Sequence, residues 1–185
     1  MRFHLCVCAL VVGLGRAWAA ESVEGLPGYV DFGALSMPRD AHSSIEVFLK
    51  GPVLKLVAAA SRQEDPEVAA LIDRIRLIRV QGFSVRPGDR AAVQEEMAAL
   101  ARRLEEKEWE RVAQVREEDE VTQVLVKVAG DGDALCGLVV MSLEEGEEAV
   151  FVNIVGDLDP EQLGRIGRTF DIAPLDSLRL GRQAH

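Results

Sequence analysis

Few residues in this chain are of the types that catalyse reactions or bind metal ions. It holds three histidines and three cysteines, against 31 aspartates and glutamates. A Ser–His–Asp triad needs a central histidine, and zinc, copper and haem sites need several His or Cys ligands. His42 lies in a Pro- and Gly-containing stretch, and no P-loop, Gly-x-Gly-x-x-Gly, His-Glu-x-x-His or Cys-x-x-Cys pattern occurs. We therefore expect no motif-defined catalytic residue, no cofactor and no metal site.

Carboxylates are the abundant reactive groups. A hydrolase can work with two of them, but nothing in the sequence marks a particular pair. Asp131-Gly132-Asp133 resembles the start of a calcium loop and lacks the later ligands, so a hairpin turn is the favoured interpretation. The acidic stretches 117–120 and 144–148 read as solvated turns that discourage edge-to-edge pairing, rather than as loose cation sites.

Asn153 is the single candidate ligand-binding residue. It lies among Val150, Phe151, Val152, Ile154 and Val155 in an otherwise apolar run. A buried amide needs hydrogen-bond partners. Two alternatives remain open: the amide bonds the backbone of a helix end or of the N-terminal lead-in, or it contacts a ligand.

The first 19 residues have the three parts of a secretory signal peptide. Arg2 and His4 give a positive start, 5–14 is apolar, and Ala17-Trp18-Ala19 ends the segment. We expect cleavage near Ala19-Ala20, a periplasmic or secreted protein, and no stable membrane insertion, because about 20 apolar residues are needed to cross a bilayer. Cys136 is then the only remaining cysteine, and its apolar surroundings predict a buried, unreactive thiol.

Charge and composition exclude further classes of function. The net charge is −10, and aromatic residues make up 5% of the chain. Nucleic acids and anionic membranes attract basic surfaces, and single-stranded nucleic acids also need aromatic platforms. We expect no nucleic-acid partner.

Hydrophobic periodicity and turn residues predict one α+β domain. Strands are expected at 45–50, 76–85, 110–117, 121–129, 134–143 and 148–156, and helices near 52–60, 66–75, 90–107 and after Asp159. The order is β-α-α-β-α-β-β-β-β-α. We expect a single, mostly antiparallel sheet of about five to six strands with a C-terminal four-strand meander, and helices on one face. The regions are a signal peptide (1–19), a loose lead-in (20–44), the domain (45–169) and a peripheral tail (170–185).

Several segments resemble one bacterial protein family. They are Pro27-Gly28-Tyr29-Val30-Asp31, the stretches 47–54, 109–112 and 138–140, and, most specifically, 150–160. They resemble the family described as domain of unknown function 4252. The resemblance implies an exported envelope protein with an α+β domain, and a link to envelope stress signalling through neighbouring sigma-factor systems. This chain lacks the lipoprotein cysteine of some relatives, and the family lends it no activity and no functional residues.

Two hypotheses of function follow. The first is a non-catalytic binding or interaction module of the envelope, with a protein or a small ligand as its partner. The second is a carboxylate-based hydrolase of the envelope. Two acids converging in a deep cleft favour the hydrolase, whereas a flat surface with an exposed apolar patch favours binding. The sequence does not indicate an oligomeric state.

Overall fold

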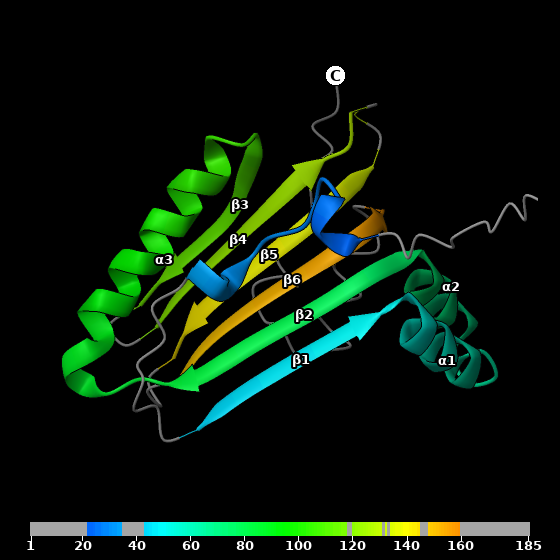
Figure 1. The fold of residues 1–185 in the computed structure, drawn as a ribbon, viewed down its shortest axis with the longest axis horizontal. Helices are drawn as coiled ribbons and strands as arrows, with labels where there is room; N and C mark the ends of the chain where they lie inside the picture. The colour runs from blue at the N-terminus through cyan, green and yellow to red at the C-terminus, as the bar shows by residue number, and fades with distance from the viewer. Residues whose placement is uncertain are drawn as a thin grey trace, which may run out of the picture.

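The computed structural model describes residues 22–34, 43–117, 120–130, 132, 134–144 and 148–159. They form one six-stranded antiparallel sheet in the order β1-β2-β6-β5-β4-β3 (Figure 1). The strands are β1 Ser44–Lys50, β2 Ile75–Ser84, β3 Trp109–Arg116, β4 Val121–Val128, β5 Leu135–Leu143 and β6 Glu148–Leu158. The helices are α1 Gly51–Ser61, α2 Pro66–Arg74 and α3 Arg90–Glu105.

The α+β class and the C-terminal meander are confirmed. Strands β3 to β6 pair in chain order, each antiparallel to the next, and β6 also pairs with β2. Asp65 caps α2 as its position before Pro66 predicts, because its Oδ1 accepts hydrogen bonds from the N–H groups of Glu67 and Val68. The expected last helix, the signal peptide (1–19) and the tail (170–185) lie outside the described residues.

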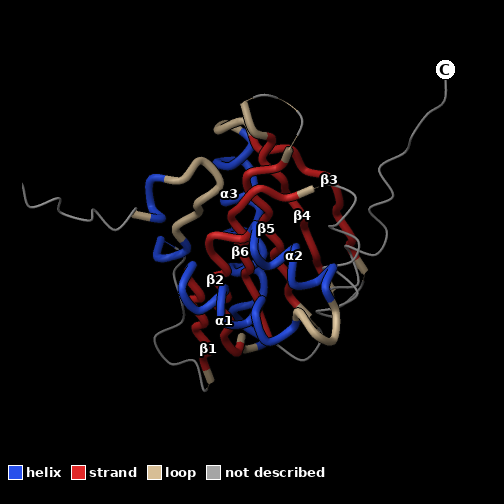
Figure 2. Tube along the Cα trace, turned by 90° about the vertical axis from the view of Figure 1, so that its right-hand side faces the viewer, coloured by secondary structure: helices blue, strands red, loops and turns tan. Residues whose placement is uncertain are grey.

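The helices are divided between the two faces of the sheet, so the expectation that they lie on one face is wrong. Helix α3 packs in a cluster with Phe151 and Met141. Helices α1 and α2 pack in a second cluster with Ile154 and Leu138, whose side chains point to the opposite face. Figure 1 shows α3 and the α1–α2 pair at opposite ends of the sheet, and Figure 2 views the molecule from the α1–α2 end. The physical reason is that β4 and β5 are apolar on both faces, so both faces need a covering layer.

The N-terminal segment 22–34 lies across the same face as α3, over β5 and β6 (Figure 1). It contains two short 3-10 turns, Val23–Gly25 and Phe32–Ala34. Val30 and Phe32 are buried, and the Phe32 ring centroid lies 5.8 Å from that of Phe151. This part of the lead-in is therefore packed rather than loose, and Phe32 anchors it to the sheet.

Candidate functional site

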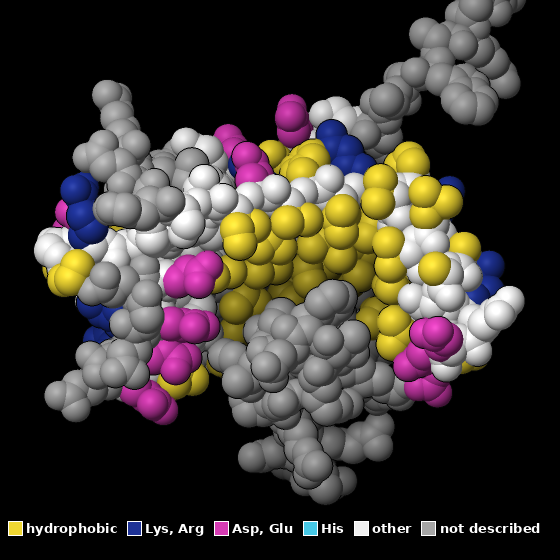
Figure 3. All heavy atoms as spheres, turned by 90° about the horizontal axis from the view of Figure 1, so that it is seen from below, with side chains coloured by type: hydrophobic (Ala, Val, Ile, Leu, Met, Phe, Trp, Pro, Cys, Tyr) yellow, Lys and Arg dark blue, Asp and Glu magenta, His cyan; other side chains and the backbone are white. Residues whose placement is uncertain are grey.

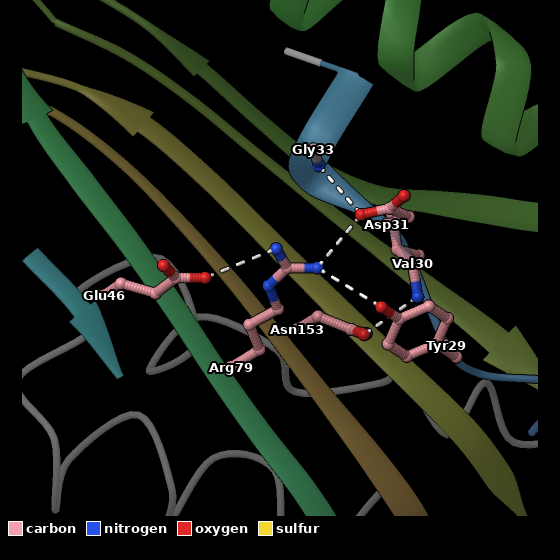
Figure 4. A network of polar contacts seen from close by, with 7 residues as sticks. All are labelled: Tyr29, Val30, Asp31, Gly33, Glu46, Arg79 and Asn153. Atoms are coloured by element: carbon pink, nitrogen blue, oxygen red, sulfur yellow. Dashed lines mark hydrogen bonds and ion pairs between the residues drawn. The ribbon is translucent and has the colours of Figure 1, made fainter. Parts of the chain in front are cut away.

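Asn153 ties the N-terminal segment to the sheet. Its side chain is fully buried in β6. Its Oδ1 accepts a hydrogen bond from the Val30 N–H at 3.0 Å (Figure 4), and its Nδ2 donates to the carbonyl oxygens of Gly28 at 3.0 Å and Leu138 at 3.2 Å. These are the lead-in contacts that one of the two alternatives predicts. A ligand could reach this amide only if the segment above it moved.

Arg79 lies beside Asn153, at the position that faces it across the β2–β6 pair. Its side chain is only 10% exposed. Nη1 donates to Asp31 Oδ1 at 3.2 Å and to Tyr29 Oη at 3.3 Å, and Nη2 lies 3.6 Å from Glu46 Oε1 (Figure 4). The guanidinium carbon lies 5.6 Å and 5.9 Å from the ring centroids of Phe32 and Phe48. Arg79 thus joins the N-terminal segment, β2 and β1 through charge and aromatic contacts.

Sequence reasoning did not single out Arg79. The run Ile78-Arg79-Val80-Gln81 alternates as in a strand, which places Arg79 and Gln81 on the face opposite Ile78 and Val80 but does not indicate what covers that face. Its partners Tyr29 and Asp31 lie about 50 positions earlier in the chain. Only the packing of segment 22–34 brings these groups together.

A pocket of about 610 Å³ opens beside Arg79. Its lining residues are Glu24, Tyr29, Asp31, Glu46, Phe48 and Arg79. The hydrogen bond from the Gly33 N–H, followed by the Arg79 side chain, lowers the pKa of Asp31 below its ordinary value of 3.8. A general acid needs a raised pKa, so Asp31 is suited to holding a positive or hydrogen-bonding group rather than to donating a proton.

The pKa of Asp31 predicts a pH-dependent effect of Asp31→Asn. A carboxylate whose pKa is lowered by folding stabilises the folded state above its unfolded-state pKa, and this contribution disappears as the pH falls through the folded-state pKa. Asp31 is 67% exposed, so solvent screening limits the difference in unfolding free energy to below about 1 kcal/mol. Urea unfolding of both proteins at about pH 7 and about pH 3 should show a destabilised variant that converges on the parent in acid. A pH-independent difference would contradict the pairing.

The second feature is an apolar surface, which we term the β1–α1 edge: strand β1 and the exposed side of α1. Among the described residues, every large hydrophobic side chain that is clearly exposed belongs to it. These are Ile45, Phe48, Val53, Leu56 and Val57, with Leu56 71% exposed. Viewed from the β1 side, hydrophobic side chains line a hollow next to this edge (Figure 3).

The two edges of the sheet differ in their protection against pairing. At β3, the exposed residues are polar or charged, and a register shift lies between Arg111 and Ala113. Charges and bulges of this kind discourage pairing with another strand. Strand β1 also exposes the charged Glu46 and Lys50, but it pairs with β2 without a register shift and exposes Ile45 and Phe48. Of the two edges, β1 is the one better suited to accept another strand.

The outward-facing backbone groups of β1 follow from its register. The Ser84 N–H donates to the carbonyl of Ser43, which is the residue directly opposite. Hydrogen-bonded and non-hydrogen-bonded pairs alternate along an antiparallel ladder. Ile45, Val47 and Leu49 therefore bond β2, and the N–H and C=O groups of the alternate residues point away from the sheet. These outward residues are Ser44, Glu46, Phe48 and Lys50, although the Lys50 carbonyl, at the N-cap of α1, accepts the first hydrogen bond of that helix.

Residues 39–166 match a family model described as domain of unknown function (DUF4252). The chain belongs to this family. The match confirms the resemblance seen in the sequence. No curated protein and no solved structure matches the chain.

The DUF4252 match includes all six strands, and therefore Arg79, Asn153 and the β1–α1 edge. It begins after Tyr29 and Asp31, which supply two of the contacts to Arg79. The site thus combines the family domain with a segment that precedes the match.

Other groups add little chemistry in the described part of the chain. Cys136 is half-buried rather than buried, with its Sγ 3.7 Å from the carbonyl oxygen of Val128. Among the described side chains, no group of three or more His, Cys, Asp and Glu residues is placed to hold a metal ion. None of the described helices has both the length and the apolar character needed to cross a membrane.

Proposed function

We propose that this protein is a non-catalytic interaction module of the bacterial cell envelope that binds a protein partner along the β1–α1 edge. The observation that carries the proposal is the gathering of the exposed large hydrophobic side chains on β1 and α1. Exposed apolar surface of this kind marks interaction sites, and an open sheet edge recognises an extended segment through its backbone.

The acids beside Arg79 support binding over hydrolysis. The side chains of Asp31 and Glu46 are 67% and 65% exposed, and both form ion pairs with Arg79. A carboxylate-based hydrolase needs one carboxyl held protonated by its surroundings. The surroundings of Asp31 act in the opposite direction. The envelope location is supported by the signal-peptide pattern of residues 1–19.

Site-specific photo-crosslinking in cells tests the proposed surface. A photoreactive amino acid placed at Phe48 or Leu56 of the full chain should give discrete protein adducts, because both side chains are exposed on the β1–α1 edge. The same group at Gln114, exposed on β3, is the matched control and should give few. Mass spectrometry identifies each adduct. Equal labelling from all three positions, or none from any, would contradict the proposal.

A further inference from the structure

We infer that the partner of β1 is a second copy of this chain, paired antiparallel with β1 about a two-fold axis that passes through Phe48. The inference rests on the proposed function, because it names the partner of the same edge. Pairing of this kind joins two six-stranded sheets into one continuous sheet. A two-fold interface uses the same surface of both copies, so β1 must be complementary to itself.

The backbone restricts where such an axis can lie. The outward N–H and C=O groups of β1 belong to Ser44, Glu46 and Phe48, and Lys50 adds its N–H, because its carbonyl caps α1. They bond a second β1 only when outward residues of one copy lie opposite outward residues of the other. This condition requires the axis to pass through a residue rather than between two residues. The axis can then pass through any of the five residues from Glu46 to Lys50, and the side chains must distinguish among these five arrangements.

Charge selects Phe48 among these positions. Glu46 and Lys50 are the only charged residues of β1 and project from the same face of the strand. An axis through Phe48 places Glu46 of each copy opposite Lys50 of the other. An axis through Glu46 or Lys50 places like charges opposite each other, and one through Val47 or Leu49 pairs neither charge. Opposite charges on facing strand positions stabilise a sheet, and like charges destabilise it.

The apolar side chains agree with the same axis. On the face that carries Glu46, the two Phe48 side chains meet at the axis, and 40% of each is exposed in the single copy. On the other face, Val47 lies opposite Leu49 of the second copy. Ile45, which is 55% exposed, lies opposite Gly51 at the start of the second copy's α1. The pairing therefore covers the exposed apolar side chains of β1.

The pairing also brings the second copy to the Arg79 pocket. Glu46 and Phe48 line that pocket, and both are paired residues in this arrangement. Lys50 already lies over the Phe48 ring, with its Nζ 4.6 Å from the centroid. Lys50 of the second copy then adds a positive charge next to Glu46, and the two pockets open on the same face of the joined sheet.

Cysteine pairing tests the register directly. In a full chain with Cys6, Cys8 and Cys136 replaced by Ser, Phe48→Cys should form a disulfide-linked dimer on mild oxidation. A hydrogen-bonded antiparallel pair has Cα atoms about 5.5 Å apart, which suits a disulfide. The control is Ile45→Cys in the same chain. Its counterpart in the second copy lies about 20 Å away, so it should remain monomeric on a non-reducing gel.

Charge reversal tests the side-chain pairing. Lys50→Glu should weaken dimerisation by roughly tenfold in analytical ultracentrifugation, because both cross-strand ion pairs become repulsive. Adding Glu46→Lys to it exchanges the charges and should recover much of the affinity. Arg103→Glu, the same change of charge on the exposed side of α3, should have no effect. Circular dichroism checks that each variant is folded. Glu46→Lys also removes an ion pair of Arg79. If that loss disturbs the fold, the comparison of Phe48→Cys with Ile45→Cys decides the register.

The outcomes distinguish this inference from the proposed function. A purified protein that stays monomeric, without a Phe48→Cys disulfide, overturns the second copy as the partner. So does a disulfide from Ile45→Cys as rapid as that from Phe48→Cys, because it shows a different register or random collision. In either case, adducts of another protein at Phe48 and Leu56 in cells leave the proposed function standing. If the protein is monomeric and no protein adduct of any kind, including one between two copies of this chain, forms at Phe48 or Leu56, the proposed function fails as well.

Discussion

Replacing Asn153 with alanine is expected to lower the free energy of unfolding by about 2–4 kcal/mol. The amide bonds three backbone groups: the Val30 N–H and the carbonyl oxygens of Gly28 and Leu138. All of them lose this partner in the variant, and the Asn153 site is fully buried. Leaving buried polar groups unpaired costs more than a hydrogen bond contributes on average. Thermal or urea unfolding of the purified variant measures the loss.

Gln123→Met is the matched control for Asn153→Ala. Gln123 is also a buried amide, on β4 and on the same face of the sheet. Its Oε1 has no hydrogen-bond partner among the described residues. Replacing it with an apolar side chain of similar size should leave stability nearly unchanged or slightly raised. An Asn153→Ala variant as stable as the parent would show that this amide does not hold the segment, and would favour the ligand-contact alternative.

The order of elements is readable from the sequence because local signals mark each one. Asp65-Pro66 starts α2, and alternation with short turns defines the meander of β3 to β6. The division of the helices between faces has no such signal. In β4 and β5 apolar residues occupy both faces, so periodicity does not say which helix covers which. That choice is made by packing between distant segments.

The residues of the candidate site also differ in how far the sequence alone predicts them. Asn153 stands out because an amide in an apolar strand needs an explanation wherever it occurs. Arg79 does not stand out, because an arginine at an alternate strand position is ordinary. Its environment depends on Tyr29, Asp31, Glu46 and Phe48, which come from two other segments. The exposed β1–α1 edge was equally hidden, because the sequence shows apolar residues but not which of them remain uncovered.

Gly28→Ala is expected to destabilise the protein by about 3 kcal/mol, which lowers the melting temperature of a domain of this size by roughly 6–12 °C. A Cβ at Gly28 would lie 2.0 Å from the carbonyl oxygen of Cys136 and 2.7 Å from the Cα of Gly137. Gly137 has the converse constraint, because its own Cβ would lie 2.7 Å from the Cα of Gly28. The two backbones cross where neither can carry a side chain. Differential scanning calorimetry measures the shift.

Gly25→Ala separates this steric requirement from the flexibility of glycine. Gly25 lies in the same segment, and a Cβ there would meet nothing within 4 Å. Neither glycine has a positive φ, so the two substitutions differ in space rather than in backbone strain. Gly25→Ala should therefore stay within about 0.5 kcal/mol of the parent.

In Gly28→Ala, separation of the segment from β5 also breaks the hydrogen bond from Asn153 to the Gly28 carbonyl and uncovers Cys136, whose pocket is lined by Leu26 and Pro27. Thiol labelling of Cys136 should accelerate in Gly28→Ala and not in Gly25→Ala. Equal melting temperatures and equal labelling rates would mean that the segment does not lie against β5 in solution.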